Sequence, residues 1–160
     1  MRDANPVVEQ LLGGWGIAGI TNWHTGYPFT ILANTATDFS GFNQFADRAN
    51  IGSTPVTFNY NTPTNVFNKT LFSSPGAGNI GNTGRNAFYG PSYTDFDFSV
   101  QKTFHITESK RLKMQGDFFN LFNHPNFALP VGNLGSAAAG TITSMTGNPR
   151  LMQVGLRFDF

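Results

Sequence analysis

The 160-residue sequence contains no cysteine, little charge and no long hydrophobic run. Without cysteine, the chain cannot form disulfides or thiolate metal sites. Charged residues make up 12% of the sequence, whereas they make up about a quarter of typical soluble domains. The formal net charge is +1 and the basic residues are scattered, so nucleic-acid binding is not expected. No apolar run approaches the roughly 20 residues that a transmembrane helix needs.

Phenylalanine and glycine are abundant instead, with 17 and 18 residues. Helical periodicity is almost absent, because Gly or Pro interrupts nearly every window long enough for a helix. Four segments instead alternate apolar and polar residues, a period that predicts β-strands. They lie at about residues 15–31, 93–106, 111–122 and 150–160. We therefore predict an all-β fold, an antiparallel meander of about four long strands.

The predicted strands are long, and their connections differ sharply in length. A tilted membrane-crossing strand needs about 9 to 11 residues, whereas soluble strands average about 5 or 6. The second and third strands are separated by little more than T-E-S-K, and even-numbered residues are apolar on both sides of it. The loop must then hold an odd number of residues, and we expect roughly three to five. The other connections, about residues 32–90 and 123–148, are long and polar. Short turns at one end and long loops at the other are typical of an outer-membrane β-barrel.

In such a barrel, each strand turns one face to lipid and the other to the lumen. The apolar residues predicted to face lipid are Phe96, Phe98, Val100, Leu112, Met114, Phe118, Val154, Leu156 and Phe158. The polar residues predicted to face the lumen are Asp97, Gln101, Lys113, Gln115, Asp117, Gln153 and Arg157. Lys102 is the one charge on the predicted lipid face. We interpret it as lying near the periplasmic boundary, where its ammonium reaches the headgroups, rather than as a functional site within the membrane.

Several motifs, in order along nearly the whole chain, resemble the carboxyl-terminal part of TonB-dependent outer-membrane receptors of the Oar-like group. They are G-W-G-I-A-G-I-T-N-W-H-T-G-Y-P-F-T, A-D-R-A-N-I-G, G-N-I-G-N-T-G-R-N-A-F-Y-G-P, D-F-D-F-S-V-Q-K-T-F, F-F-N-L-F-N-H-P-N-F and G-N-P-R-L-M-Q-V-G-L-R-F-D-F. The resemblance implies a barrel of about 22 strands with a plug domain inside it. It also implies ligand uptake energised by the TonB complex. It further implies that the barrel assembly machinery reads an aromatic terminal signal, here Leu156, Phe158 and Phe160.

The sequence departs from that family in what it lacks. We recognise no plug and no TonB-box, and the amino end carries acids and Pro6 where a secretory signal needs a basic start and an apolar core. Four strands cannot close a barrel. We therefore expect the carboxyl-terminal portion of a larger barrel in the bacterial outer membrane. Its partners would be lipid, the missing amino-terminal strands and the plug.

Other functions remain as alternatives. A secreted or surface all-β glycan-binding module is one, and a passive channel or adhesin barrel is another. No motif for nucleophilic or metal-dependent catalysis occurs, so we expect no enzyme. The segment G-A-G-N-I-G fits a dinucleotide-binding pattern, but no apolar strand precedes it, so we expect a loop and no cofactor. His24, His105 and His124 lie on separate segments, and we expect no metal site.

Two sets of residues carry further expectations. Arg48 and Arg85 lie in the long predicted loop. We favour a structural role, in which Asp47 and the arginines pair with one another or with the barrel rim and hold the loop in shape, and we keep ligand contact as the alternative. Aromatic residues near predicted strand ends fit an interfacial girdle, with ordinary packing as the alternative. These are Trp15, Tyr27, Phe29, Tyr89, Tyr93 and Phe160.

Overall fold

A computed structural model describes residues 6–43 and 45–160 and divides the chain into two compact units. The first, which we call the sheet unit, comprises Met1–Trp23, Thr94–Pro125 and Asn148–Phe160. The second, the loop unit, comprises His24–Tyr93 and Asn126–Gly147. No helix in the described ranges is long and apolar enough to cross a membrane.

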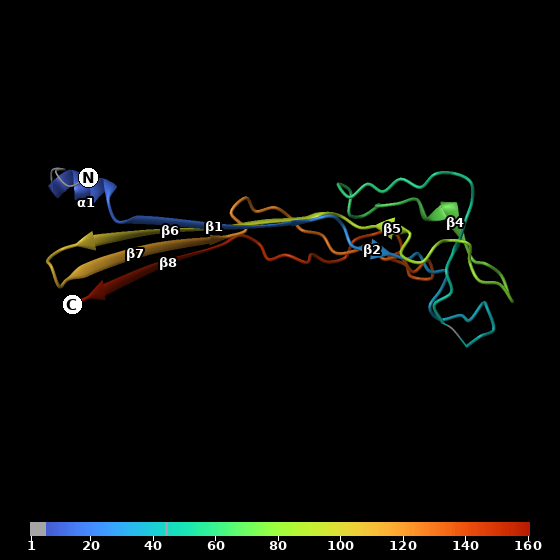
Figure 1. The fold of residues 1–160 in the computed structure, drawn as a ribbon. Helices are drawn as coiled ribbons and strands as arrows, with labels where there is room; N and C mark the ends of the chain where they lie inside the picture. The colour runs from blue at the N-terminus through green and yellow to red at the C-terminus, as the bar shows by residue number, and fades with distance from the viewer. Residues whose placement is uncertain (1–5, 44) are drawn as a thin grey trace. The chain divides into compact units, whose positions relative to one another are not determined.

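The sheet unit is built on four long strands (Figure 1). They are β1 (Trp15–His24), β6 (Tyr93–His105), β7 (Arg111–Phe119) and β8 (Leu151–Asp159), in the order β1-β6-β7-β8. Residue pairing makes β6, β7 and β8 antiparallel. Thr103 N donates to Gly14 O at 2.8 Å, and a Cβ added at Gly16 would lie 2.5 Å from the Gln101 side chain, so β1 is antiparallel to β6. The predicted antiparallel all-β fold is confirmed.

The turn between β6 and β7 has the predicted parity. His105 pairs with Arg111, which leaves five residues, 106–110, between the two strands. Ile106 N donates to Lys110 O at 3.0 Å inside this turn. Because the loop length is odd, even-numbered residues of both strands share one face, and β8 joins in the same parity.

Two of the predicted strands end earlier than expected. The first ends at His24 rather than at residue 31; a separate short strand, β2 (Pro28–Phe29), pairs with β5 (Phe88–Tyr89). Between β1 and β2, a Cβ at Gly26 would lie only 1.8 Å from Gly90 O, so two backbones touch there directly.

The third strand ends at Phe119 rather than at residue 122 because Asn120 has φ +49°, which extended backbone cannot accommodate. Asn120 is buried, and its Nδ2 donates to the backbone oxygens of His124 at 3.1 Å and Asn148 at 2.9 Å. Its backbone N donates to Asp97 Oδ1 at 3.0 Å. The side chain thus takes over hydrogen bonding where the strand ladder stops.

A short helix, α1 (Pro6–Leu12), lies in a region where we expected none. Its end is marked by two glycines: Gly13 N donates to Glu9 O at 2.8 Å, and Gly14 has φ +71°. Proline at the first position and glycine just past the end are common helix boundaries. Figure 1 shows α1 at the same end of the sheet as the carboxyl terminus and the β6–β7 turn.

Helix α1 accounts for the surroundings of the Lys102 side chain. They correct the interpretation that its ammonium reaches the headgroups. Lys102 is 5% exposed, and its Nζ donates to Leu11 O at 3.2 Å and to Gly13 O. The same ammonium lies 5.0 Å from the centre of the Trp15 ring. A cation is favourable at the carboxyl end of a helix, where carbonyl groups lack partners. Lys102 therefore holds α1 against the sheet.

The loop unit has a hydrophobic core that sequence periodicity did not indicate. Its short elements are β2, β5, β3 (Asn50–Ile51), β4 (Phe72–Ser73) and the 3₁₀ helix η1 (Lys69–Leu71). The buried core residues are Phe29, Ile31, Ala49, Val66, Phe67 and Phe72. The Phe58 ring lies 5.8 Å from Phe29 and 5.4 Å from Phe88. Phe29, at 6% exposure, is thus a core residue and not part of an exposed girdle.

Tyr60 lies against this core, and its hydroxyl donates to Tyr89 O. Burial raises the pKa of Tyr60 from its ordinary value to about 12, because the charged phenolate would lose hydration. The neutral phenol is therefore favoured in the folded state. Its contribution to stability is complete below a pH of about 10 and is lost as the pH rises through the pKa of the folded state.

The other aromatic residues predicted to form the girdle differ in exposure. Trp15, Tyr27, Tyr89 and Phe160 are exposed, whereas Tyr93 is partly buried.

Replacing Lys102 with Met should detach α1 from the sheet. The change removes a charged donor from two carbonyl oxygens, so we expect the free energy of unfolding to fall by about 1–3 kcal/mol. Chymotrypsin cleavage at Leu11 and Leu12 should also become faster. Lys113→Met is the matched control, because Lys113 is an exposed lysine on the opposite face of the sheet. Equal cleavage rates in the two variants would contradict the assigned role of Lys102.

Candidate functional site

Polar side chains from three strands meet in one row across the sheet. Ser99 pairs with Asp117, and Asp117 pairs with Gln153. Ser99 Oγ donates to Asp117 Oδ1 at 2.6 Å, and Gln153 Nε2 donates to Asp117 Oδ2 at 3.1 Å. The carboxylate of Asp117 thus links β6, β7 and β8 through side chains as well as through the backbone ladder.

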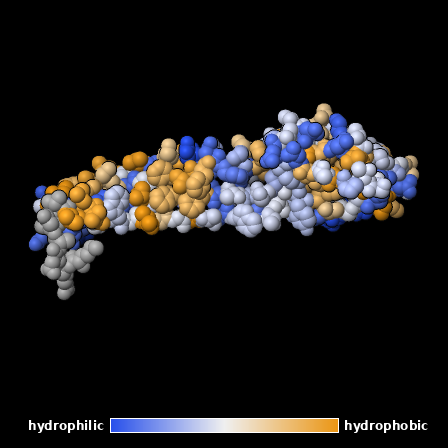
Figure 2. Space-filling view, turned by 90° about the horizontal axis from the view of Figure 1, so that it is seen from above, coloured by the Kyte–Doolittle hydropathy of each residue, from blue (hydrophilic) through white to orange (hydrophobic). Residues whose placement is uncertain are grey.

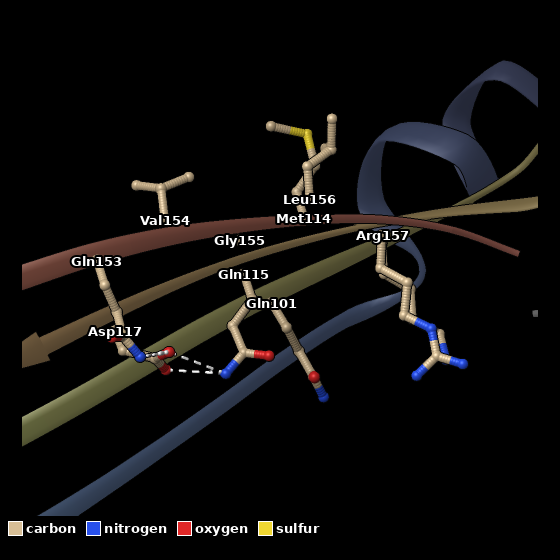
Figure 3. A pocket seen from close by; sticks show the side chains of 10 residues that line it. Gln101, Met114, Gln115, Asp117, Gln153, Val154, Gly155, Leu156 and Arg157 are labelled. Carbon is tan, nitrogen blue, oxygen red and sulfur yellow. Dashed lines mark hydrogen bonds between the residues drawn. The ribbon is translucent and has the colours of Figure 1, made fainter.

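Gln115, two residues before Asp117 on the same strand face, completes this network. Its Nε2 lies 3.0 Å from each oxygen of Asp117 (Figure 3). An ionised carboxylate offers about four acceptor positions, so these donors occupy the group fully. Asp117 therefore organises the polar face; the arrangement does not leave it as a free base.

A second polar cluster lies closer to the β6–β7 turn. Asp159 Oδ2 is 3.4 Å from Lys113 Nζ, and Asp159 Oδ1 accepts from Arg157 Nε at 2.7 Å. Lys113 and Arg157 are themselves a directly opposed pair on β7 and β8. Two cations facing each other would repel, and the shared carboxylate offsets that repulsion.

A depression of about 550 Å³ on this part of the sheet is lined by the polar residues Gln101, Lys113, Gln115, Asp117, Gln153 and Arg157. In Figure 3, Gln101, Gln115, Asp117, Gln153 and Arg157 point to one side of the ribbons, whereas Met114, Val154 and Leu156 point to the other. The strand register and parity place all the predicted lumen-facing residues on this one polar face. They are Asp97, Gln101, Lys113, Gln115, Asp117, Gln153 and Arg157. That this face borders a lumen stays a prediction.

The opposite face of the sheet is apolar and exposed. Val154 is 82% and Leu156 is 69% exposed. Figure 2 shows hydrophobic side chains, interspersed with polar ones, over the sheet unit. Phe158 and Phe160, which the family resemblance implies to be assembly signals with Leu156, stack with ring centres 6.2 Å apart. Monomeric soluble proteins rarely expose large contiguous apolar surfaces.

The remaining predicted residues lie outside the polar face. Arg48 and Arg85 line one depression in the loop unit. The glycine-rich segment G-A-G-N-I-G contains a turn. The backbone N of Gly78 in this segment donates to Phe39 O at 2.7 Å. His24 stacks on Tyr93 with ring centres 5.0 Å apart. Within residues 6–43 and 45–160, no group of three or more His, Cys, Asp or Glu side chains is placed to hold a metal.

Comparison with known proteins identifies a family match. A family model described as "Outer membrane beta barrel domain" matches residues 1–153, which include β1, β6, β7 and the start of β8. No curated protein and no solved structure matches the chain.

The hydrogen-bond network centred on Asp117 can be tested by a double-mutant cycle. We expect Asp117→Ala and Gln153→Ala each to lower the free energy of unfolding. The double variant should lose less than the sum of the two, because both single changes break the same hydrogen bond. Gln101→Ala is the control: Gln101 lines the same depression, and the described structure records no hydrogen bond between it and Asp117. Denaturant unfolding measures all four variants, and additive losses for Asp117 and Gln153 would contradict the network.

Proposed function

Because this chain belongs to the outer membrane beta barrel domain family, we propose that its four long strands form part of the barrel wall of a TonB-dependent receptor. The family indicates an outer-membrane location. The observation that carries the proposal is the phase of the strands: one face of the sheet is apolar and exposed, and the other is polar and internally hydrogen-bonded. This is the alternation that a barrel wall needs between lipid and a polar interior.

Strand length and the sheet edges support the barrel wall. The four strands contain 10, 13, 9 and 9 residues, close to the roughly 9 to 11 that span a bilayer. The outer strands β1 and β8 each have one edge without a neighbour in the described sheet. Unpaired backbone groups are costly in lipid, so in this proposal further strands pair with both edges and close the barrel.

The receptor assignment rests on the family resemblance of the motifs quoted above. In a receptor of this kind, the loop unit would capture a ligand outside the cell, and a plug and the TonB complex would couple uptake to energy. The proposal gives the protein a transport role rather than an enzymatic one. In this proposal the carboxylates of Asp117 and Asp159, which hold hydrogen bonds and ion pairs, are structural groups of the barrel wall.

A glycan-binding soluble module fits the exposed apolar face poorly, because Val154 and Leu156 would lie in water. A passive channel or an adhesin barrel would have the same wall, and it differs from a receptor in having no contact with TonB. Assembly of either barrel would proceed through the barrel assembly machinery, with Leu156, Phe158 and Phe160 as the proposed signal.

Thiol labelling tests which face meets lipid. These 160 residues contain no cysteine, so one introduced thiol in this region reports on its own position. In outer membranes carrying the full-length protein, Gln153→Cys should react with a charged, water-soluble thiol reagent. Val154→Cys, its neighbour on the opposite face, should react only after denaturation. Gln115→Cys and Met114→Cys form a second matched pair, and mass spectrometry measures the labelling. Rapid labelling of Val154→Cys in intact membranes would exclude the barrel-wall assignment.

Cross-linking to TonB tests the receptor assignment separately. Formaldehyde treatment of cells that express the full-length protein should give a cross-linked species recognised by antibodies to both partners. Deleting the TonB-box of the parent protein should abolish it, because that segment is the coupling contact the family resemblance implies. If thiol labelling confirms the wall while no cross-link forms, the protein is a passive channel or an adhesin barrel.

A further inference from the structure

The loop unit contains a depression of about 580 Å³ lined by two arginines. Its lining residues are Thr30, Leu32, Ala46, Asp47, Arg48, Ile80, Arg85 and Asn86. This volume lies within the range of small-molecule sites, about 300–1,000 Å³. The residues come from three separate stretches of the chain, all inside the loop unit.

Arg48 is held on rigid backbone beside this depression. Arg48 forms an isolated antiparallel β-bridge with Leu32. The next residue, Ala49, is fully buried, and its backbone N donates to Ile31 O at 3.0 Å. The Arg48 Nε is buried and has no hydrogen-bond partner among the described residues. A guanidinium N–H that is desolvated and has no hydrogen-bond partner is costly in free energy.

Arg85 reaches the same depression from a fixed turn. The following residue, Asn86, has φ +53°, and its N donates to Thr30 Oγ1 at 2.8 Å. Thr30 Oγ1 in turn donates to Asn86 Oδ1 at 3.3 Å. Both arginines are thus placed by backbone that is itself anchored, which lowers the entropy cost of binding.

The nearby carboxylate does not pair with either arginine. One expected arrangement paired Asp47 with the arginines, but Asp47 Oδ2 accepts from Phe39 N at 2.7 Å and Ser40 N at 3.0 Å. Across the described chain, both recorded ion pairs lie in the sheet unit instead. Two guanidinium groups and one carboxylate leave the depression with a formal charge of +1.

We propose that this depression, the Arg48–Arg85 pocket, binds a small organic anion with a carboxylate or phosphate group and a short apolar part. The two guanidinium groups supply forked donors suited to such groups. Leu32, Ala46 and Ile80 supply the apolar wall, and the side chain of Ile80 is 58% exposed. The inference deepens the proposed receptor function by giving the class of its ligand.

Calorimetric titration of the full-length protein in detergent tests the pocket. The probes are butyrate and butyl phosphate, with butanol as the uncharged control. We expect saturable binding of at least one anion and none of butanol. Arg48→Gln and Arg85→Gln should each weaken that binding by about tenfold or more, since each removes a charged hydrogen-bond donor. Arg48→Lys should recover only part of the loss, because an ammonium lacks the fork.

Lys69→Gln is the matched control, because it removes one exposed positive charge from the same unit outside the pocket. It should change anion affinity less than about twofold. If the Arg48→Gln variant loses its circular dichroism signal and so does not fold, the Arg85→Gln variant decides the outcome, because Arg85 is exposed. Absence of saturable anion binding, equal binding of butanol, or equal losses for Lys69→Gln and Arg85→Gln would overturn the proposal. Uptake is not measured here, so an absence of TonB coupling would leave this result intact.

Discussion

The sheet unit depends on cross-strand register. Residues of equal parity face one another from β6 through β7 to β8, as in the row Val100, Gly116 and Val154. The adjacent row, Ser99, Asp117 and Gln153, is polar throughout and hydrogen-bonded. A shift of one residue on any strand would place polar side chains among apolar ones on both faces. The five-residue turn therefore fixes this register through the backbone, and the Asp117 network fixes it through the side chains.

The strands were predictable because alternation is local, and so is the parity of the turn that joins two of them. Their ends were not predictable, since Asn120 and its positive φ leave no trace in a hydropathy pattern. Helix α1 was missed because seven residues are too few to show a helical period, although the proline and the paired glycines at its ends were visible. Lys102 was misjudged for the same reason, as its partners belong to that helix.

The loop unit shows a different limit of prediction from the sequence. Its aromatic core is assembled from residues spread between Phe29 and Phe88 without regular spacing. The sequence pattern therefore predicted only a long polar loop there. The polar face of the sheet could be listed from parity alone, yet only the structure shows that Asp117 gathers three donors. In the same way, no spacing rule brings Arg48 and Arg85 to one pocket. Their placement comes from the packing of Ala49 and the turn at Asn86.

The contact between Lys102 and α1 also bears on the order of folding. It joins residues 91 and 89 positions apart in the chain, so it closes a very long loop. Such contacts form late, because a large loss of chain entropy precedes them, whereas the β6–β7 hairpin closes locally. Until α1 docks, the ammonium of Lys102 stays hydrated on an otherwise apolar surface. Helix α1 is therefore expected to dock only after the β6–β7 hairpin has formed, although it precedes that hairpin in the sequence.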